Sequence, residues 1–131
     1  MSKSRELRYP IVSRGEVYLC DFGKTRDHEI RGIRYAIIVS NNLANQFSPN
    51  VTVLPCTTQV KKSQLPVHSV FQFSKDNIVD YNPKIGEKIN VALGESVKEA
   101  SKTRLLKYLG KLTDSFMKEY INPILRISLD L

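Results

Sequence analysis

The side chains best suited to chemistry lie at the ends of two apolar segments of this sequence. Arg34 stands at the start of the run 33–40, IRYAIIVS, and Thr57 stands at the end of the run 51–58, VTVLPCTT. His28 lies in the charged segment just before the first run. If the two runs are neighbouring strands, a guanidinium, a hydroxyl and an imidazole meet at one rim of the fold.

This set of groups suits the scission of RNA without a metal. RNA supplies its own nucleophile, the 2′-hydroxyl, next to the scissile phosphate. The protein then has to supply a base for that hydroxyl, an acid for the leaving 5′-oxygen, and donors for the negatively charged transition state. DNA has no 2′-hydroxyl, so it would bind at such a site without being cut by this route.

Other kinds of catalysis fit the sequence poorly. The two histidines and two cysteines lie in unrelated segments and show none of the usual metal-ligand spacings. There is also no glycine-rich phosphate loop and no serine nucleophile motif. Cys20 and Cys56 lie within strand patterns, which favours inert core thiols over a Cys–His protease. We therefore expect neither a metal nor another cofactor.

Composition sets the class of protein and of partner. A chain of 131 residues is long enough for one domain with a real core. The 20 basic residues against 13 acidic ones give a formal charge of +7, which favours a polyanionic partner such as a nucleic acid. Only two cysteines, no apolar signal core and no membrane-spanning run predict a reduced, cytoplasmic protein without a membrane partner.

The hydrophobic pattern predicts short strands separated by turn signals. We expect strands over 15–22, 33–40, 51–58, 65–73, 89–94 and 107–112. The second is apolar almost throughout and should be central. Pro55 cannot donate to a ladder, so it indicates a bulge or an edge in the third. Residues 74–88 read as a long hairpin connection.

Two helices complete the predicted elements. Asn41 is placed to cap a two-turn helix over 41–47, and Thr113 to cap a terminal helix over 113–129 that Pro123 should kink or restart. The residues 100–106 favour a short helical turn. Together these elements predict one small, strongly bent β-barrel over 14–131, behind a loose N-terminal arm over 1–13.

Blocks in a particular order cover nearly all of the chain after Ser13. They are RGEVYLCDF, HEIRGIRYAIIVSNN, VTVLPCTTQ, LPVHS, GES and ISL. Together they resemble the MazF/PemK (Kid) family, the toxin endoribonucleases of type II toxin–antitoxin systems. The resemblance implies a mainly β fold with α, a small SH3-like or CcdB-like barrel with a short helix after the second strand and a C-terminal helix.

The resemblance also implies an activity and partners. Members of the family are mRNA interferases that cleave single-stranded RNA at short sequence motifs without a metal. They leave a 2′,3′-cyclic phosphate or 3′-phosphate and a 5′-hydroxyl. They usually act as homodimers with the RNA in a groove that both subunits line, and a cognate antitoxin inhibits them.

Carried over residue by residue, the resemblance assigns catalysis to three positions. Arg34 would bind the scissile phosphate and take part in proton transfer, Thr57 would stabilise the transition state, and His28 would assist catalysis. Glu95 matches a position that is a catalytic aspartate in the PemK branch, so the choice of His28 or Glu95 as the base stays open. The predicted substrate-binding residues are Glu29, Thr58, Gln59, Lys61, Lys62, Glu95 and Lys98.

Three departures from the family pattern leave the RNA motif open. Tyr35 replaces the proline that usually follows the arginine, Ser96 stands where glutamine is common, and residues 74–87 do not follow the usual pattern. For His68 we expect a structural role or a role at the edge of the RNA site.

Two other functions on the same barrel remain open from sequence. A CcdB-like toxin poisons DNA gyrase without catalysis, chiefly through contacts of the C-terminal helix, and would not need Arg34. A plain RNA-binding barrel would need aromatic stacking platforms, which this chain, without tryptophan, largely lacks.

Overall fold

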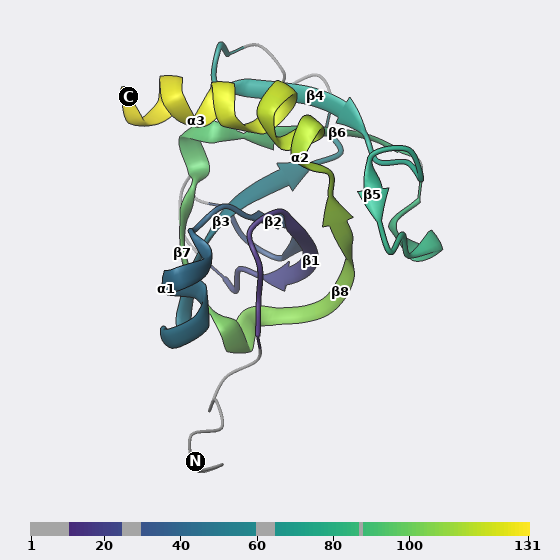
Figure 1. Cartoon of the computed structure of the whole chain (residues 1–131). Coiled ribbons are helices and arrows are strands. Elements are labelled where there is room, and N and C mark those ends of the chain that lie inside the picture. Colours follow the sequence, from purple (N-terminus) through teal and green to yellow (C-terminus); the bar gives the residue numbers. More distant parts are fainter. Residues whose placement is uncertain (1–10, 25–29, 60–64, 87) are drawn as a thin grey trace.

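A computed structural model describes residues 11–24, 30–59, 65–86 and 88–131 (Figure 1). In these residues an antiparallel sheet of eight strands curls on itself, in the order β4-β6-β3-β2-β1-β8-β5, with β7 also paired to β3. The strands are β1 (Glu16–Asp21), β2 (Ile33–Ile38), β3 (Asn50–Thr57), β4 (His68–Gln72), β5 (Ile78–Val79), β6 (Ile89–Leu93), β7 (Lys98–Ser101) and β8 (Leu105–Leu112). The helices are α1 (Asn42–Phe47), α2 (Asp114–Phe116) and α3 (Asn122–Leu129).

The barrel is formed by β7, β3, β2, β1 and β8, and β4 and β6 extend it (Figure 1). A 3-10 turn over Lys102–Arg104 joins β7 to β8. The long strand β3 belongs to both parts, because its residues Asn50–Val53 pair with β7 and its end, Cys56 and Thr57, pairs with β6. The predicted small, bent β-barrel, with a short helix after the second strand and a helix at the C-terminus, is confirmed.

Pro55 lies where β3 exchanges one neighbour for another. β3 has partners on both sides, and its register with β2 runs without a shift from Val53 to Pro55. No bulge forms at Pro55, but within the described residues β3 has no partner there on the side away from β2, because the pairing with β7 ends at Val53 and the pairing with β6 begins at Cys56. The prediction of a bulge or an edge is therefore confirmed in its second form. The proline falls between the β7 and β6 pairings, a place where a missing ladder N–H is tolerated.

Each face of β2 is buried in a separate hydrophobic core. Ile37 belongs to the core that β4, β6 and the C-terminal helices cover, together with Phe73 and Phe116. Ala36 and Ile38 belong to the core inside the barrel. Burial on both faces explains the continuous apolar run, and the prediction that this strand is central is confirmed.

The two predicted helices form, the second in segments. Asn41 Oδ1 accepts from the backbone N–H of Ala44 at 2.8 Å at the start of α1. Thr113 Oγ1 accepts from the N–H of Phe116 at 3.2 Å at the start of α2. A π-helical segment, Met117–Ile121, follows, and α3 then starts with Pro123 in its first turn, so the predicted restart is confirmed. None of the helices in the described residues is long and apolar enough to cross a membrane.

Two short strands do not appear in the sequence-based prediction. β5 lies in the predicted hairpin connection and pairs with the end of β8. β7, with the sequence KEAS, pairs with β3 and has no buried residue. Neither shows an apolar alternation. β7 is held by backbone pairing with a longer neighbour, and β5 by such pairing together with burial of the single side chain of Ile78, which is 3% exposed.

Both thiols are buried and free, as predicted. Cys20 is 0% exposed and Cys56 is 2% exposed. Burial is the largest cause that raises the pKa of the Cys20 thiol, to about 11, and burial also raises the pKa of the Cys56 thiol. Both thiols therefore stay protonated in the folded protein at neutral pH.

We expect these thiols to resist alkylation in the native protein. At pH 8.5 an unperturbed thiol is about half ionised, whereas the native thiols remain neutral. Iodoacetamide at pH 8.5 should thus modify both cysteines in denaturant and neither within the same time without denaturant, as read by mass spectrometry.

Since each folded pKa lies above its unfolded value, the free energy of unfolding should also fall as the pH rises above about 8.5. Rapid native labelling of either cysteine would contradict this account.

Gly110 in β8 makes room for the chain at β5. Its φ is +131°, and an added Cβ would collide with Ile78 Cγ2 and lie 3.1 Å from the backbone oxygens of Val79 and Asp80. We expect Gly110→Ala to lower the free energy of unfolding by about 2 kcal/mol or more, through backbone strain and displacement of β5. The control is Gly86→Ala, which has a φ of +73° but open space around it, so only strain contributes. Equal losses for the two variants in urea unfolding would show that the contact with β5 does not matter.

Candidate functional site

Arg34 and Thr57 line the same cavity. In the antiparallel pairing of β2 with β3, Ala36 lies opposite Pro55, and the same register continued by two residues places Arg34 opposite Thr57. The cavity has a volume of about 250 Å³. It is lined by Leu19, Ile33, Arg34, Tyr35, Cys56, Thr57, Thr58 and Asn90. The prediction that the two strand ends meet at one rim is confirmed.

Among the described residues, the Arg34 guanidinium is anchored at one nitrogen and has no partner at the other two. Its Nε donates to the backbone oxygen of Arg31 at 2.9 Å, which fixes the side chain across the turn before β2. Within the described residues Nη1 and Nη2 take part in no hydrogen bond or ion pair. The four N–H groups of these two nitrogens, which share the positive charge of the guanidinium, are therefore available to an anion in the cavity.

Thr57 presents a hydroxyl from a rigid strand end. The residue is 5% exposed and pairs with Val91 of β6. Its Oγ1 accepts from the backbone N–H of Gln59 at 3.1 Å. That bond uses a lone pair of the oxygen, so the hydroxyl proton remains available for donation.

The other predicted site residues divide into three groups. Thr58 lines the cavity beside Thr57, and Gln59, which is exposed, follows it. Lys98 lies on β7 with its Nζ 5.9 Å from the centre of the Phe22 ring, and lines a second cavity of about 260 Å³ with Asp21 and Arg104 among its walls. The predicted residues His28, Glu29, Lys61 and Lys62 lie outside the described residues.

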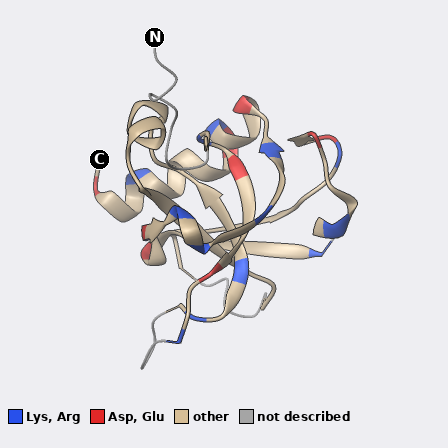
Figure 2. Cartoon of the chain, turned by 90° about the horizontal axis from the view of Figure 1, so that it is seen from below, with Lys and Arg blue, Asp and Glu red and all other residues tan. Residues whose placement is uncertain are grey.

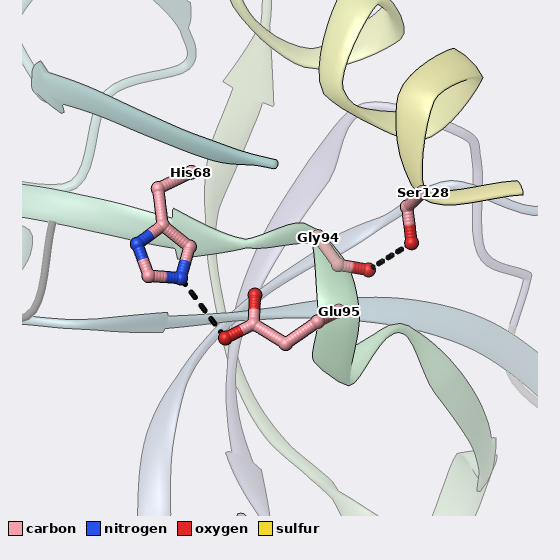
Figure 3. A network of polar contacts seen from close by, with 4 residues as sticks. All are labelled: His68, Gly94, Glu95 and Ser128. Atoms are coloured by element: carbon pink, nitrogen blue, oxygen red, sulfur yellow. Dashed lines mark hydrogen bonds and ion pairs between the residues drawn. The ribbon is translucent and has the colours of Figure 1, made fainter. Parts of the chain in front are cut away.

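Glu95 does not line the cavity of Arg34 and Thr57. It lies in the 3-10 turn Gly94–Ser96 after β6, and its Oε2 is 2.9 Å from Nε2 of His68 at the start of β4 (Figure 3). The structure therefore separates Glu95 from the two residues with which the sequence analysis grouped it as a possible base. The physical reason is that β6 runs away from Thr57, so a residue beyond its end lies further along the molecule.

Two residues that the sequence analysis did not assign to the site also shape the cavity. Tyr35 donates its hydroxyl to the backbone oxygen of Ile85 at 2.8 Å, and burial raises the pKa of this phenol, which keeps it a donor. Asn90 is 1% exposed and its Nδ2 donates to the oxygen of Lys88 at 3.1 Å, whereas its Oδ1 is buried and has no partner in the described part of the chain. The sequence feature that could have indicated Asn90 is its place as a polar residue inside the apolar strand INVAL.

The molecule carries a positive net charge, and its described residues contain no cluster of metal ligands. Nowhere in the described ranges do three His, Cys, Asp or Glu side chains gather as metal ligands would. Lys and Arg are distributed over several parts of the molecule and are not confined to one face (Figure 2). A net charge of +7 favours the approach of polyanions over long range, and Arg34 places one cation in the lining of the cavity.

Solved structures share this fold along nearly the whole chain. An endoribonuclease from a mycobacterial species has a TM-score of 0.68 and 22% identity, and the match covers 95% of this chain and 96% of that one. MazF from Deinococcus radiodurans has a TM-score of 0.70 and 17% identity, over 93% and 99% of the two chains. A mycobacterial endoribonuclease in complex with its cognate antitoxin has a TM-score of 0.64 and 25% identity, over 92% and 95%.

Sequence comparison places the chain in a family. Endoribonuclease MazF of Staphylococcus saprophyticus is 34% identical over 121 residues, which are 92% of this chain and 93% of that protein. The family model described as PemK-like, MazF-like toxin of type II toxin-antitoxin system matches residues 13–128. With Arg34 and Thr57 in one cavity of a barrel of this kind, the chain belongs to the PemK-like, MazF-like toxin family of type II toxin–antitoxin systems.

Proposed function

We propose that this protein is a metal-independent, sequence-selective endoribonuclease that cleaves single-stranded RNA as the toxin of a toxin–antitoxin system. The observation that carries the proposal is the cavity in which the open nitrogens of Arg34 lie with the hydroxyl of Thr57. The kinship with endoribonuclease MazF of Staphylococcus saprophyticus supports the same activity.

The reaction follows from the groups that the cavity offers to a phosphodiester. The ribose 2′-oxygen forms a bond to phosphorus while the bond from phosphorus to the 5′-oxygen breaks. A base takes the 2′-hydroxyl proton, and an acid gives a proton to the 5′-oxygen, which leaves as a hydroxyl. The products are a 2′,3′-cyclic phosphate, which water opens to a 3′-phosphate, and a 5′-hydroxyl.

Arg34 and Thr57 have distinct tasks in this reaction. The Arg34 guanidinium binds the non-bridging phosphate oxygens, whose charge grows in the transition state, and takes part in proton transfer. The Thr57 hydroxyl adds a neutral donor to the same oxygens. His28 is the proposed base. The proposed RNA-binding residues are Glu29, Thr58, Gln59, Lys61, Lys62 and Lys98.

The protein partners in this proposal are a second copy of the chain and a cognate antitoxin. α3 carries the exposed apolar side chains Ile127 and Leu129, and Leu131 follows it with 86% exposure. A homodimer would remove such a surface from water. The related mycobacterial endoribonuclease in complex with its cognate antitoxin supports an antitoxin partner, and the two free thiols suit the cytoplasm.

Removal of either group from the cavity should abolish most of the cleavage. We expect Arg34→Ala to lower the cleavage rate by about a hundredfold or more, because it removes the charge on the phosphate. Thr57→Val keeps the shape of this buried side chain and removes its hydroxyl, and should cost about tenfold to a hundredfold. The measurement is cleavage of a long single-stranded RNA by antitoxin-free protein in excess EDTA, with the 5′ ends sequenced.

Matched variants separate catalysis from charge and from folding. Lys118→Ala removes one exposed positive charge from the helical C-terminal segment, and Thr52→Val makes the same change as Thr57→Val in the same strand. Neither residue lines the cavity, and both variants should cut at the wild-type rate. Uncut RNA with wild-type protein would refute the catalytic proposal and favour a gyrase-type or binding-only toxin.

The 2′-hydroxyl mechanism predicts the behaviour of modified substrates. An oligonucleotide with a single 2′-deoxy nucleotide on the 5′ side of the cleaved bond should bind with little change in affinity and should not be cut there, because the nucleophile is missing. Mass spectrometry of the all-RNA products should show cyclic phosphate or 3′-phosphate ends. Cleavage of the deoxy substrate, or products with a 3′-hydroxyl, would contradict the mechanism.

A further inference from the structure

We propose that His68 is a positioning residue that sets base specificity. It holds the Glu95 carboxylate in one orientation, so that the free oxygen of that carboxylate accepts a hydrogen bond from an exocyclic amino group of the RNA. The inference rests on the proposed function, since it concerns recognition by the same enzyme at a place away from the Arg34 cavity.

The His68 imidazole is buried and contacts Glu95 through one of its two nitrogens. The His68 side chain is 4% exposed, and its Nε2 lies 2.9 Å from Glu95 Oε2 (Figure 3). Its Nδ1 is buried and has no partner within the described residues. A proton on Nδ1 would have no acceptor, so the proton of the neutral ring belongs on Nε2, which donates it to Glu95.

The backbone of the turn that carries Glu95 is held by hydrogen bonds on two sides. The N–H of Gly94 donates to the oxygen of Val67 at 3.0 Å, and Ser128 Oγ of α3 donates to the oxygen of Gly94 at 2.7 Å (Figure 3). A Cβ at Gly94 would lie 2.5 Å from the Val67 oxygen, so only glycine permits this approach. The turn is thus clamped between β4 and α3, while His68 fixes the side chain that the turn carries.

The Glu95 carboxylate is half-exposed and is bound through one of its two oxygens. The Glu95 side chain is 43% exposed, and the bond to His68 engages Oε2. Oε1 makes no hydrogen bond within the described residues. A half-exposed pair of this kind adds little to stability, but an oriented acceptor saves a ligand the entropy of ordering the side chain. The contact of His68 with Glu95 therefore suits the binding of a ligand better than the stabilisation of the fold.

Glu95 lies a short way along the chain from the residue that pairs with Thr57. Val91 of β6 pairs with Thr57, and Glu95 follows Val91 by four residues along the same chain. At about 3.3 Å per residue, the Cα atoms of Val91 and Glu95 are about 13 Å apart or less. A single strand of RNA whose scissile phosphate lies at Arg34 can place a neighbouring base within reach of Glu95.

The chemistry of a carboxylate then selects the base. An ionised carboxylate only accepts hydrogen bonds, and it repels phosphate, so it binds a base edge and not the backbone. Adenine, cytosine and guanine carry an exocyclic amino group. Uracil carries none, and its one ring donor on the base-pairing edge, N3–H, lies between two carbonyl oxygens that repel a carboxylate. We therefore expect one position of the cleavage motif to disfavour uracil by about tenfold.

The test compares base preferences in a library of random single-stranded RNA, with 5′-end sequencing. His68→Leu removes the donor and should reduce the discrimination against uracil about tenfold at that single position, while other positions keep their preferences. His68→Gln retains an N–H donor and should keep most of the discrimination. Glu95→Gln should lose it, because an amide also donates to the carbonyl groups of uracil. Ratios between bases do not depend on the folded fraction, so a variant that is merely less stable cuts more slowly with an unchanged motif.

The outcomes separate the inference from the proposed function. If wild-type protein cuts no RNA, the function and the inference both fail. If it cuts and Glu95→Gln leaves every motif position unchanged, the function stands and base recognition by Glu95 is wrong. If Glu95→Gln alters the motif and His68→Leu does not, the positioning role of His68 is wrong.

Discussion

The pairing of β2 with β3 is the constraint on which the rest of this molecule depends. Both strands have neighbours on each side, and β2 is buried on both faces. Their antiparallel register brings the first residues of one strand opposite the last residues of the other. A slip of one residue would turn Ile37 out of its core and move Arg34 away from Thr57 at the same time. Burial of the strand centres thus fixes the polar ends without any direct bond between them.

The polar contacts around the cavity show how a buried framework supports an open site. Tyr35 and Asn90 each bind a backbone oxygen of the connection before β6, which holds that connection beside the cavity. In the part of the chain that the structure describes, Arg34 is anchored through Nε alone. Within the described residues the groups at the rim are thus held by neighbours while the terminal nitrogens of Arg34 and the hydroxyl proton of Thr57 make no bond that the structure records. Such an arrangement suits the proposed catalysis, which needs preorganised donors.

β6 links this cavity to the turn with Glu95. Its middle residue, Val91, pairs with Thr57, and its end leads into Gly94, whose backbone is hydrogen-bonded to Val67 and Ser128. α3 packs against this turn, so the helix that carries the exposed apolar residues also contacts the backbone that positions Glu95. A partner that binds α3 would thus lie next to the turn.

Much of the fold was predictable because local patterns and burial agree. Alternation in β1 and β4, the apolar run of β2, the Asn41 and Thr113 caps and the effect of Pro123 all follow from short-range rules. β5 and β7 were not predictable, because their place depends on backbone pairing with distant strands. The local edge at Pro55 was predictable from the missing N–H of proline, whereas the two strands that leave this gap beside β3 depend on the tertiary pairing.

For the candidate site, the sequence by itself determined which groups are present: a guanidinium and a hydroxyl at the ends of two apolar strands, in a chain with a positive net charge. Only the tertiary structure decided which of them meet. It placed Arg34 and Thr57 in one cavity, added Asn90 and Tyr35, and bound Glu95 to His68 at another place. The reason is physical: a residue's type is a local property, whereas its neighbours depend on strand register and chain path, which the burial of the whole core sets.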